Sequence, residues 1–397
     1  MQLDFHYYAT YCAACLAGYS HEESLSIGYS AQFVDCCSRT VLTKLKAPVA
    51  AATTQTQLEL VDMLKDILGL QDITRIWSSF HFLPGDLYAK KKGALPPYLH
   101  KYRLICNVNS DLLVDTVKLA RDGSLQAAGV AMHVLADTWA HRYFAGTPSY
   151  VINSINHHFF ELVPEEDGFR QVRLVFRHNP SIADDPDQSI YVATPGTVEE
   201  NSILSLGHGR AGHLPDYSYA RYKYLPAWGG YEEVLKDNPS DYMNAFCQMV
   251  YALKYLRGEY DSFEKGVYDR EAVSPWREEI TRILEKRRRD ASEDWKALGE
   301  RISGRQIEDF DQEKYDREYM EAGQDEKDDT FLGLFFLAAM EQKSMVTNKI
   351  FSSGNPAAGI SIDFIQQGFK GIRDYLKLVE KAARKFIEND GKGRKDL

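Results

Sequence analysis

The chain has 397 residues, which is enough for two or three domains or for one large helical domain with appendages. Hydrophobic residues make up 44% of it and charged residues 26%, a composition typical of globular proteins that excludes a wholly disordered or fibrous chain. Acidic residues outnumber basic ones by 57 to 47, a net charge of −10, which argues against general coating of nucleic acid.

The first ten residues contain neither the basic segment nor the apolar segment of a secretory signal. The six cysteines are too few and too irregularly spaced for a disulfide framework in a chain of this length. The longest strongly apolar run, residues 331–340, is about half as long as a membrane span and predicts a core helix. We therefore expect a cytoplasmic protein without a transmembrane segment, and export by a non-classical route stays open.

The spacing of apolar residues predicts helices in the first third of the chain. Residues 7–39 fit two helices with a break at 18–20, and Ser20 with Glu23 forms a capping-box signature at the start of the second. Further helices are expected at 57–68, 111–120 and 125–144. The last of these is unusually rich in alanine and other small residues.

Residues 165–195 change character, because an alternating Q-V-R-L-V-F segment lies between Asp-Gly and Asn-Pro turn signals. We expect an inserted β hairpin or an irregular lobe there. After residue 230 the pattern is helical, and residues 259–329 carry dense mixed charge, including Arg287, Arg288 and Arg289. This region predicts solvated helices or a mobile excursion. The expected fold is mostly α, with a helical domain at 1–230 that holds the β insertion and a charged helical region at 231–397.

The most informative segment carries His133, Asp137 and His141 at successive four-residue steps. On an α-helix these side chains fall within about 80° of one another, so they project from one face. The rest of this helix is apolar, and two imidazoles with a carboxylate are unfavourable there unless something binds them. A divalent metal would do so, since imidazole nitrogens and carboxylate oxygens are zinc ligands. A structural hydrogen-bond ladder is the alternative.

Other candidate ligands lie outside this helix. His81 stands between phenylalanines just before Pro84, and Asp35 lies on the inner side of an apolar helix. Asp4 and His6 would share a face if their segment is extended. A glycine-rich loop presents three more candidates, which its glycines would allow to turn inward: His208, His213 and Asp216.

This order of residues resembles the zinc-dependent phospholipase C superfamily, which includes bacterial phospholipases C and fungal single-strand-specific nucleases. Its members have an N-terminal His, an Asp, a His beside Phe, a His-x3-Asp pair, another His, and a last His with a carboxylate. More narrowly, the M-Q-x-D-x-H-Y-Y start and the G-H-x3-G-H-x-P-D block resemble an uncharacterised bacterial family of that superfamily. The resemblance covers about residues 1–225.

The resemblance implies an all-helical enzyme with two or three zinc ions, although other divalent metals stay possible. Asp35, His81, His133 and Asp137 would bind one ion, and Asp137 would bridge to a second held by Asp4 and His6. A third would be held by His141 with His208 or His213 and Asp216. His157 and Glu161, which fit the family's His-x3-Glu spacing on a helix, are the alternative for the last pair. By resemblance, Asp35 is the general base.

Two functions follow from these expectations. The first is a metal-dependent phosphoester hydrolase that uses clustered zinc ions to activate water, acting on a small phosphodiester, a lipid head group or a nucleic acid. The second is a non-catalytic helical binding or scaffold protein that a metal stabilises. An open coordination position would distinguish them, because structural zinc sites are closed. The sequence leaves the oligomeric state open.

Overall fold

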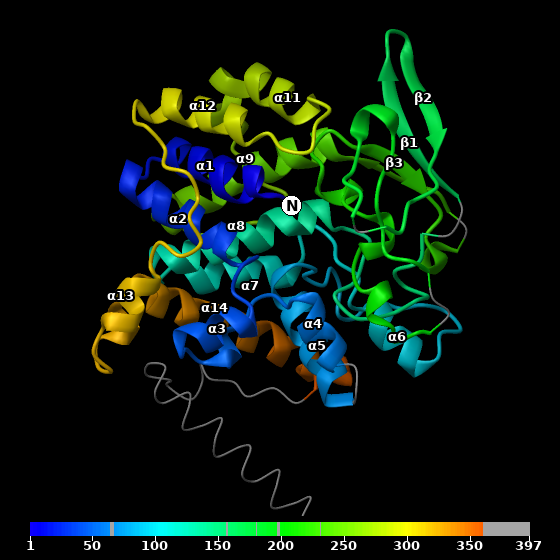
Figure 1. Ribbon diagram of the computed structural model, residues 1–397, viewed down its shortest axis with the longest axis horizontal. Coiled ribbons are helices and arrows are strands. Elements are labelled where there is room, and N and C mark those ends of the chain that lie inside the picture. The colour runs from blue at the N-terminus through cyan, green and yellow to red at the C-terminus, as the bar shows by residue number, and fades with distance from the viewer. Residues whose placement is uncertain (64–66, 156–157, 180, 197–198, 231, 360–397) are drawn as a thin grey trace, which may run out of the picture.

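The computed structural model describes residues 1–63, 67–155, 158–179, 181–196, 199–230 and 232–359. Helices form most of it, and a small antiparallel sheet stands at one side (Figure 1). The predicted mostly α fold with a small β element is therefore confirmed. Among the described residues, no helix is long and apolar enough to cross a membrane.

The chain begins with a π-helix and continues through α-helices to the sheet. These elements are η1 (Asp4–Ala9), α1 (Thr10–Leu16), α2 (His21–Phe33), α3 (Arg39–Leu45), α4 (Gln57–Met63), α5 (Ile67–Phe80), α6 (Pro96–Tyr102), α7 (Asp111–Ala120) and α8 (Leu125–Ala140). After the sheet come α9 (Asn238–Leu256), α10 (Arg270–Val273), α11 (Arg277–Glu285), α12 (Ser292–Ser303), α13 (Asp316–Glu321) and α14 (Phe331–Ser352).

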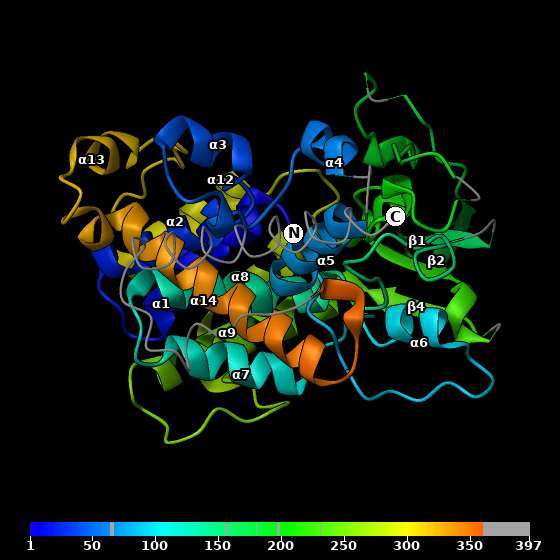
Figure 2. The same ribbon diagram turned by 90° about the horizontal axis from the view of Figure 1, so that it is seen from below.

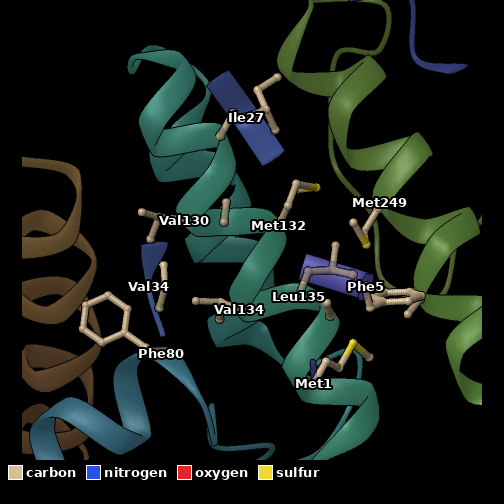
Figure 3. Packing of buried hydrophobic residues seen from close by; sticks show 14 of the residues in the cluster. Met1, Phe5, Ile27, Val34, Phe80, Val130, Met132, Val134, Leu135 and Met249 are labelled. Carbon is tan, nitrogen blue, oxygen red and sulfur yellow. The ribbon is translucent and has the colours of Figure 1, made fainter. Parts of the chain in front are cut away.

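Helix α8 forms the centre of the hydrophobic core. Its side chains are buried nearly all round the axis, because alanine, valine, leucine and methionine occupy most of its positions. It packs against α2, α7, α9 and α14, and α14 runs alongside it and α7 (Figure 2). Figure 3 shows α8 between Val34 and Phe80 on one side and Phe5 and Met249 on the other. The polar side chains of this helix are therefore inside the protein.

Helices α2 and α8 approach so closely that their backbones nearly touch at Gly129. A Cβ atom there would lie 2.5 Å from Cβ of Ser30 and 2.6 Å from the carbonyl oxygen of Ile27. His133 follows Gly129 by about one turn of α8, and Asp35 follows the end of α2. The glycine contact therefore sets the spacing between two segments that carry candidate ligands.

Several local predictions are confirmed. Ser20 and Glu23 form both hydrogen bonds of a capping box at the start of α2. The helix expected at 111–120 is α7, and the apolar run at 331–340 begins the long buried helix α14. The helix expected at 125–144 ends earlier, at Ala140, with His141 as its C-cap.

The small sheet has the strand order β2-β1-β3-β4, with all pairs antiparallel. Its strands are β1 (Phe159–Glu165), β2 (Gly168–Arg173), β3 (Arg221–Tyr224) and β4 (Val234–Asp237). The hairpin predicted at 165–195 thus begins earlier, and β4 corrects the expectation of helix directly after residue 230. Four-residue strands such as β3 and β4 are too short to carry a periodic signal and form through pairing with distant partners.

The charged region at 259–329 packs on the core more than its composition suggested. Helices α11 and α12 are amphipathic, with Ile280, Trp295 and Leu298 buried and their charged residues on the other face. Trp295 lies edge-on to Phe5, with ring centroids 5.9 Å apart. One hydrophobic cluster therefore contains residues from both sides of position 230, and the domain boundary predicted there stays a prediction.

Substitution Gly129→Ala should destabilise the protein. Helix propensity alone would favour alanine by about 1 kcal/mol. Overlap with the α2 backbone costs about 2–3 kcal/mol, so we expect the free energy of unfolding to fall by about 1–2 kcal/mol. Urea denaturation measures the change. Gly323→Ala is the matched control, since a Cβ atom there meets only the end of the Glu326 side chain. Equal stabilities of the two variants would contradict this interpretation of the helix contact.

Candidate metal centre

Histidine and aspartate side chains from separate segments meet inside the protein, close to where the N-terminus lies (Figure 1). Among the described residues, three groups could hold metal ions, and in each the possible ligand atoms lie within 4.8 Å of one another. The first group is His6, His133 and Asp137; the second is Asp35, His81 and His133; the third is His141, His208 and Asp216.

Asp137 lies at the middle of this cluster. One of its oxygens is 3.2 Å from Nε2 of His6, and the other is 3.2 Å from Nδ1 of His81 and from Nε2 of His133. The α-amino group of Met1 also approaches the first oxygen, at 2.9 Å. The carboxylate is only 1% exposed, so its charge has to be balanced by these neighbours.

The third group lies next to the first two. Nε2 of His141 is 2.9 Å from Oδ1 of Asp216, and Nε2 of His208 is 3.4 Å from the same oxygen. The Met1 amino group is 3.3 Å from this oxygen as well. The N-terminus therefore connects the two carboxylates, Asp137 and Asp216.

Backbone carbonyls determine the proton positions on four of the imidazoles. A carbonyl oxygen can only accept, so the ring nitrogen facing it carries the proton. These bonds run from His81 Nε2 to Thr53 O (3.0 Å), from His133 Nδ1 to Ala31 O (2.8 Å), from His141 Nδ1 to His81 O (2.7 Å) and from His208 Nδ1 to Gly212 O (2.8 Å). In the neutral rings, the opposite nitrogens then present lone pairs to the carboxylates.

Lone pairs that face carboxylates repel unless a cation lies between them. Nδ1 of His81 and Nε2 of His133 are only 3.3 Å apart, with a carbonyl bond on the far side of each ring. A backbone carbonyl that accepts the proton of the far ring nitrogen is the usual arrangement for a histidine that binds a metal. The donor set therefore fits bound divalent metal ions.

His6 supports the same conclusion. Its ring is fully buried and stacks on that of His133 with centroids 3.9 Å apart. Neither of its nitrogens makes a hydrogen bond within the described part of the chain, although Nε2 lies near Asp137. A buried imidazole without partners is costly, and coordination through a nitrogen would satisfy it.

Burial and mutual charge shift the pKa values of the cluster. Burial alone would raise the pKa of Asp137, but His141, the N-terminus and His133 hold it well below its usual range. Burial lowers the pKa of His6 to about 4, helped by His133 and the N-terminus. Burial would lower the pKa of the Met1 amino group, yet Asp137, Asp216 and Asp35 raise it to about 11. At neutral pH the Asp137 carboxylate is therefore ionised, His6 is neutral and the Met1 amino group is a cation.

Asp35 is the most exposed member of the cluster. Its side chain is 31% exposed, whereas those of His81 and Asp137 are 5% and 1% exposed. Its oxygens lie 3.7–4.0 Å from His6, His81 and His133, and no hydrogen bond from the described residues reaches its carboxylate. Solvent thus reaches the cluster at this residue.

Two residues named from the sequence lie elsewhere. Asp4 accepts hydrogen bonds from the amides of Phe5 (2.8 Å) and Ala291 (3.0 Å), so it faces the start of α12. Asp4 and His6 would share a face only in an extended segment, but this segment is the helix η1, where residues two apart project in different directions. His213 turns outward and bonds the Asp184 carboxylate at 3.0 Å, with 56% of its side chain exposed.

Only one of the two histidines in the glycine-rich loop, His208, reaches the cluster. Gly207 has φ +53, and a Cβ atom there would lie 2.2 Å from the Phe82 ring, so only glycine fits before His208.

The alternative ligand pair, His157 and Glu161, is not supported by the described residues. Glu161 lies in strand β1, where it accepts from Tyr191 and pairs with Arg287 at 2.7 Å, and His157 lies outside the described residues.

Sequence reasoning missed the α-amino group of Met1. The candidate ligands named from the sequence were all side chains. In the structure the terminal nitrogen, just before η1, reaches Asp137, whereas the Asp4 side chain does not. Sequence reasoning also missed the carbonyls that orient the histidines. Ala31 lies in the last turn of α2, where carbonyls lack intrahelical partners, so His133 satisfies a free helix end.

The His6 pKa predicts a loss of stability in acid once metal has been removed with a chelator. Its folded pKa of about 4 lies below the unfolded value of 6.5, so its contribution is complete above pH 6.5 and is lost as pH falls through 4. The expected contribution is about 3 kcal/mol. Urea denaturation at pH 7 and pH 4 should show a smaller pH dependence for His6→Asn than for the parent protein. An unchanged dependence would contradict the assignment.

Comparison with known families matches residues 1–350 to a family described as "Family of unknown function (DUF6765)". No curated protein and no solved structure shows a significant match. The resemblance to the phospholipase C superfamily therefore stays a prediction. Because the family match covers most of the sequence, the chain belongs to the DUF6765 family.

Proposed function

We propose that this protein is a zinc-dependent phosphoester hydrolase with two or three ions in the cluster around Asp137. The observation that carries the proposal is the set of buried imidazole nitrogens that face ionised carboxylates, each ring held by a carbonyl on its far side. One such group would be enough to bind a single structural ion, and here three groups lie close together.

Nitrogen and oxygen donors of this kind favour zinc over magnesium or calcium, which prefer all-oxygen sites. Asp35, His81 and His133 would hold one ion. Asp137, which lies near both His81 and His6, would contribute to this ion and to a neighbouring one held with His6. His141, His208 and Asp216 would hold another. The Met1 amino group lies between Asp137 and Asp216 and offers a further nitrogen if it loses its proton.

Clustered zinc ions supply a nucleophilic water near neutral pH and neutralise the oxygens of a phosphoester. Asp35 would act as general base, since its carboxylate borders three histidines, is open to solvent and has no competing hydrogen bond among the described residues. Burial of Asp137 and His133 would keep the rest of the cluster rigid during the reaction. The substrate would enter from the side of Asp35.

A metal-stabilised scaffold protein is the alternative. Its supporting observation is that the cluster is mostly buried and joins helices that are distant in sequence. Solvent access at Asp35 favours the hydrolase, because a structural zinc site has no reason to keep one ligand open.

The protein purified without added metal should contain two or three zinc equivalents per chain. Asp137→Asn should lose most of this zinc, because Asp137 adjoins His6, His81 and His133. Elemental analysis measures it. His100→Asn, which changes a histidine outside the cluster, should retain the full content. A single equivalent that resists chelation would favour the scaffold function, and no metal at all would contradict both.

Asp35→Asn should lower kcat for a simple diester such as bis(4-nitrophenyl) phosphate by about 10²–10⁴-fold, the range expected for loss of a general base. Activity is expressed per bound zinc in the same samples, so that loss of the base is separated from loss of metal. His100→Asn serves again as the control. Hydrolysis that is undetectable in the zinc-loaded parent protein, or undiminished in Asp35→Asn, would count against this function and this role respectively.

A further inference from the structure

Three consecutive arginines lie in the connection between α11 and α12, and the structure gives each a different environment. Arg287 pairs with the buried Glu161 at 2.7 Å and donates to the carbonyl of Pro186. Arg288 pairs with Asp294. Both therefore hold this connection in place. Arg289 is exposed and has no ion pair or hydrogen bond among the described residues.

Arg289 lines a pocket of about 340 Å³ beside the metal centre. The other residues around it are Gln2, Leu3, His213, Tyr217 and Asp290. Gln2 and Leu3 directly follow Met1, and Tyr217 directly follows Asp216, so two walls are chain neighbours of groups in the cluster. A molecule bound at the cluster could therefore extend into this pocket.

Two carboxylates near the pocket accept hydrogen bonds from groups other than Arg289. The Asp184 carboxylate accepts from His213 (3.0 Å), from the Tyr217 hydroxyl (2.7 Å) and from the amide of Val192 (2.7 Å). Oδ1 of Asp290 accepts the amide of Ser292 at 2.8 Å, at the start of α12. Within the described part of the chain, Arg289 is thus a cation without an ionic partner, in a protein of net charge −10.

We propose that Arg289 binds a second anionic group of the phosphoester substrate, in the pocket beside the metal centre. This inference rests on the proposed hydrolase function and narrows its substrate class to phosphoesters that carry another phosphate near the reacting one. A guanidinium suits this role, since its planar donors match phosphate oxygens in a bidentate arrangement. Nucleic-acid strands and phosphorylated lipid head groups share this chemistry.

Binding to the full-length zinc-loaded protein tests the inference by calorimetry. One arm compares thymidine 3′,5′-bisphosphate with thymidine 5′-monophosphate, and the other compares glycerophosphoinositol 4-phosphate with glycerophosphoinositol. We expect about tenfold tighter binding of the member with the additional phosphate group in one arm, the amount that one charge-assisted contact supplies. Arg289→Ala should abolish this preference, and the arm that shows it identifies the source of the substrate.

The matched control is Arg282→Ala, which removes the same charge from an exposed position on α11 away from the pocket, and it should keep the preference. No preference in either arm, or a preference that survives Arg289→Ala, would overturn the inference. Hydrolysis of bis(4-nitrophenyl) phosphate by the parent protein is measured separately. Its absence would contradict the proposed function, whereas the binding comparison decides the role of Arg289 in either case.

Discussion

The structure depends on the burial of one charged group, the carboxylate of Asp137 in the last turn of α8. A buried carboxylate is tolerated only when cations or hydrogen-bond donors surround it. Here the surroundings come from the N-terminus, the end of α5 and α8 itself, so these segments must all be held at fixed distances. Two features fix these distances. Helix α2 packs closely on α8 at Gly129, and backbone carbonyls accept hydrogen bonds from the far sides of His81 and His133. The apolar core therefore positions the polar cluster.

How much of this could be predicted from the sequence depends on where each residue lies. His133, Asp137 and His141 follow the helix period, so their common face could be predicted with no knowledge of the rest of the fold. The loop histidines could not be separated, because each follows a glycine with positive φ, Gly207 or Gly212, and only the folded loop shows that His208 faces inward and His213 outward. Asp4 depended on whether its segment was extended or helical, and a short π-helix leaves no clear signal in the sequence.

Charge patterns were less informative than apolar patterns. The run at Arg287 suggested a solvated surface, yet two of its three arginines form ion pairs that anchor the connection before α12. A sequence shows the number of charges but not their partners, which here come from a strand and a helix on either side. The same limit explains why the burial of Trp295 and Leu298 inside a highly charged region was not expected: two or three apolar residues per helix are enough to anchor it when they share one face.

The cluster is better explained by a functional role than by a role in stabilising the fold. Helices α2, α8, α9 and α14 already pack through apolar faces, so a metal is not needed to hold them together. His6 makes no hydrogen bond to the described residues, and ring nitrogens of His81 and His133 face each other 3.3 Å apart. Both features violate the rule that buried polar groups are paired. Natural proteins keep such violations mainly at functional sites. Because solvent reaches the same cluster at Asp35, the cost of assembling it is best explained by chemistry performed on a bound molecule.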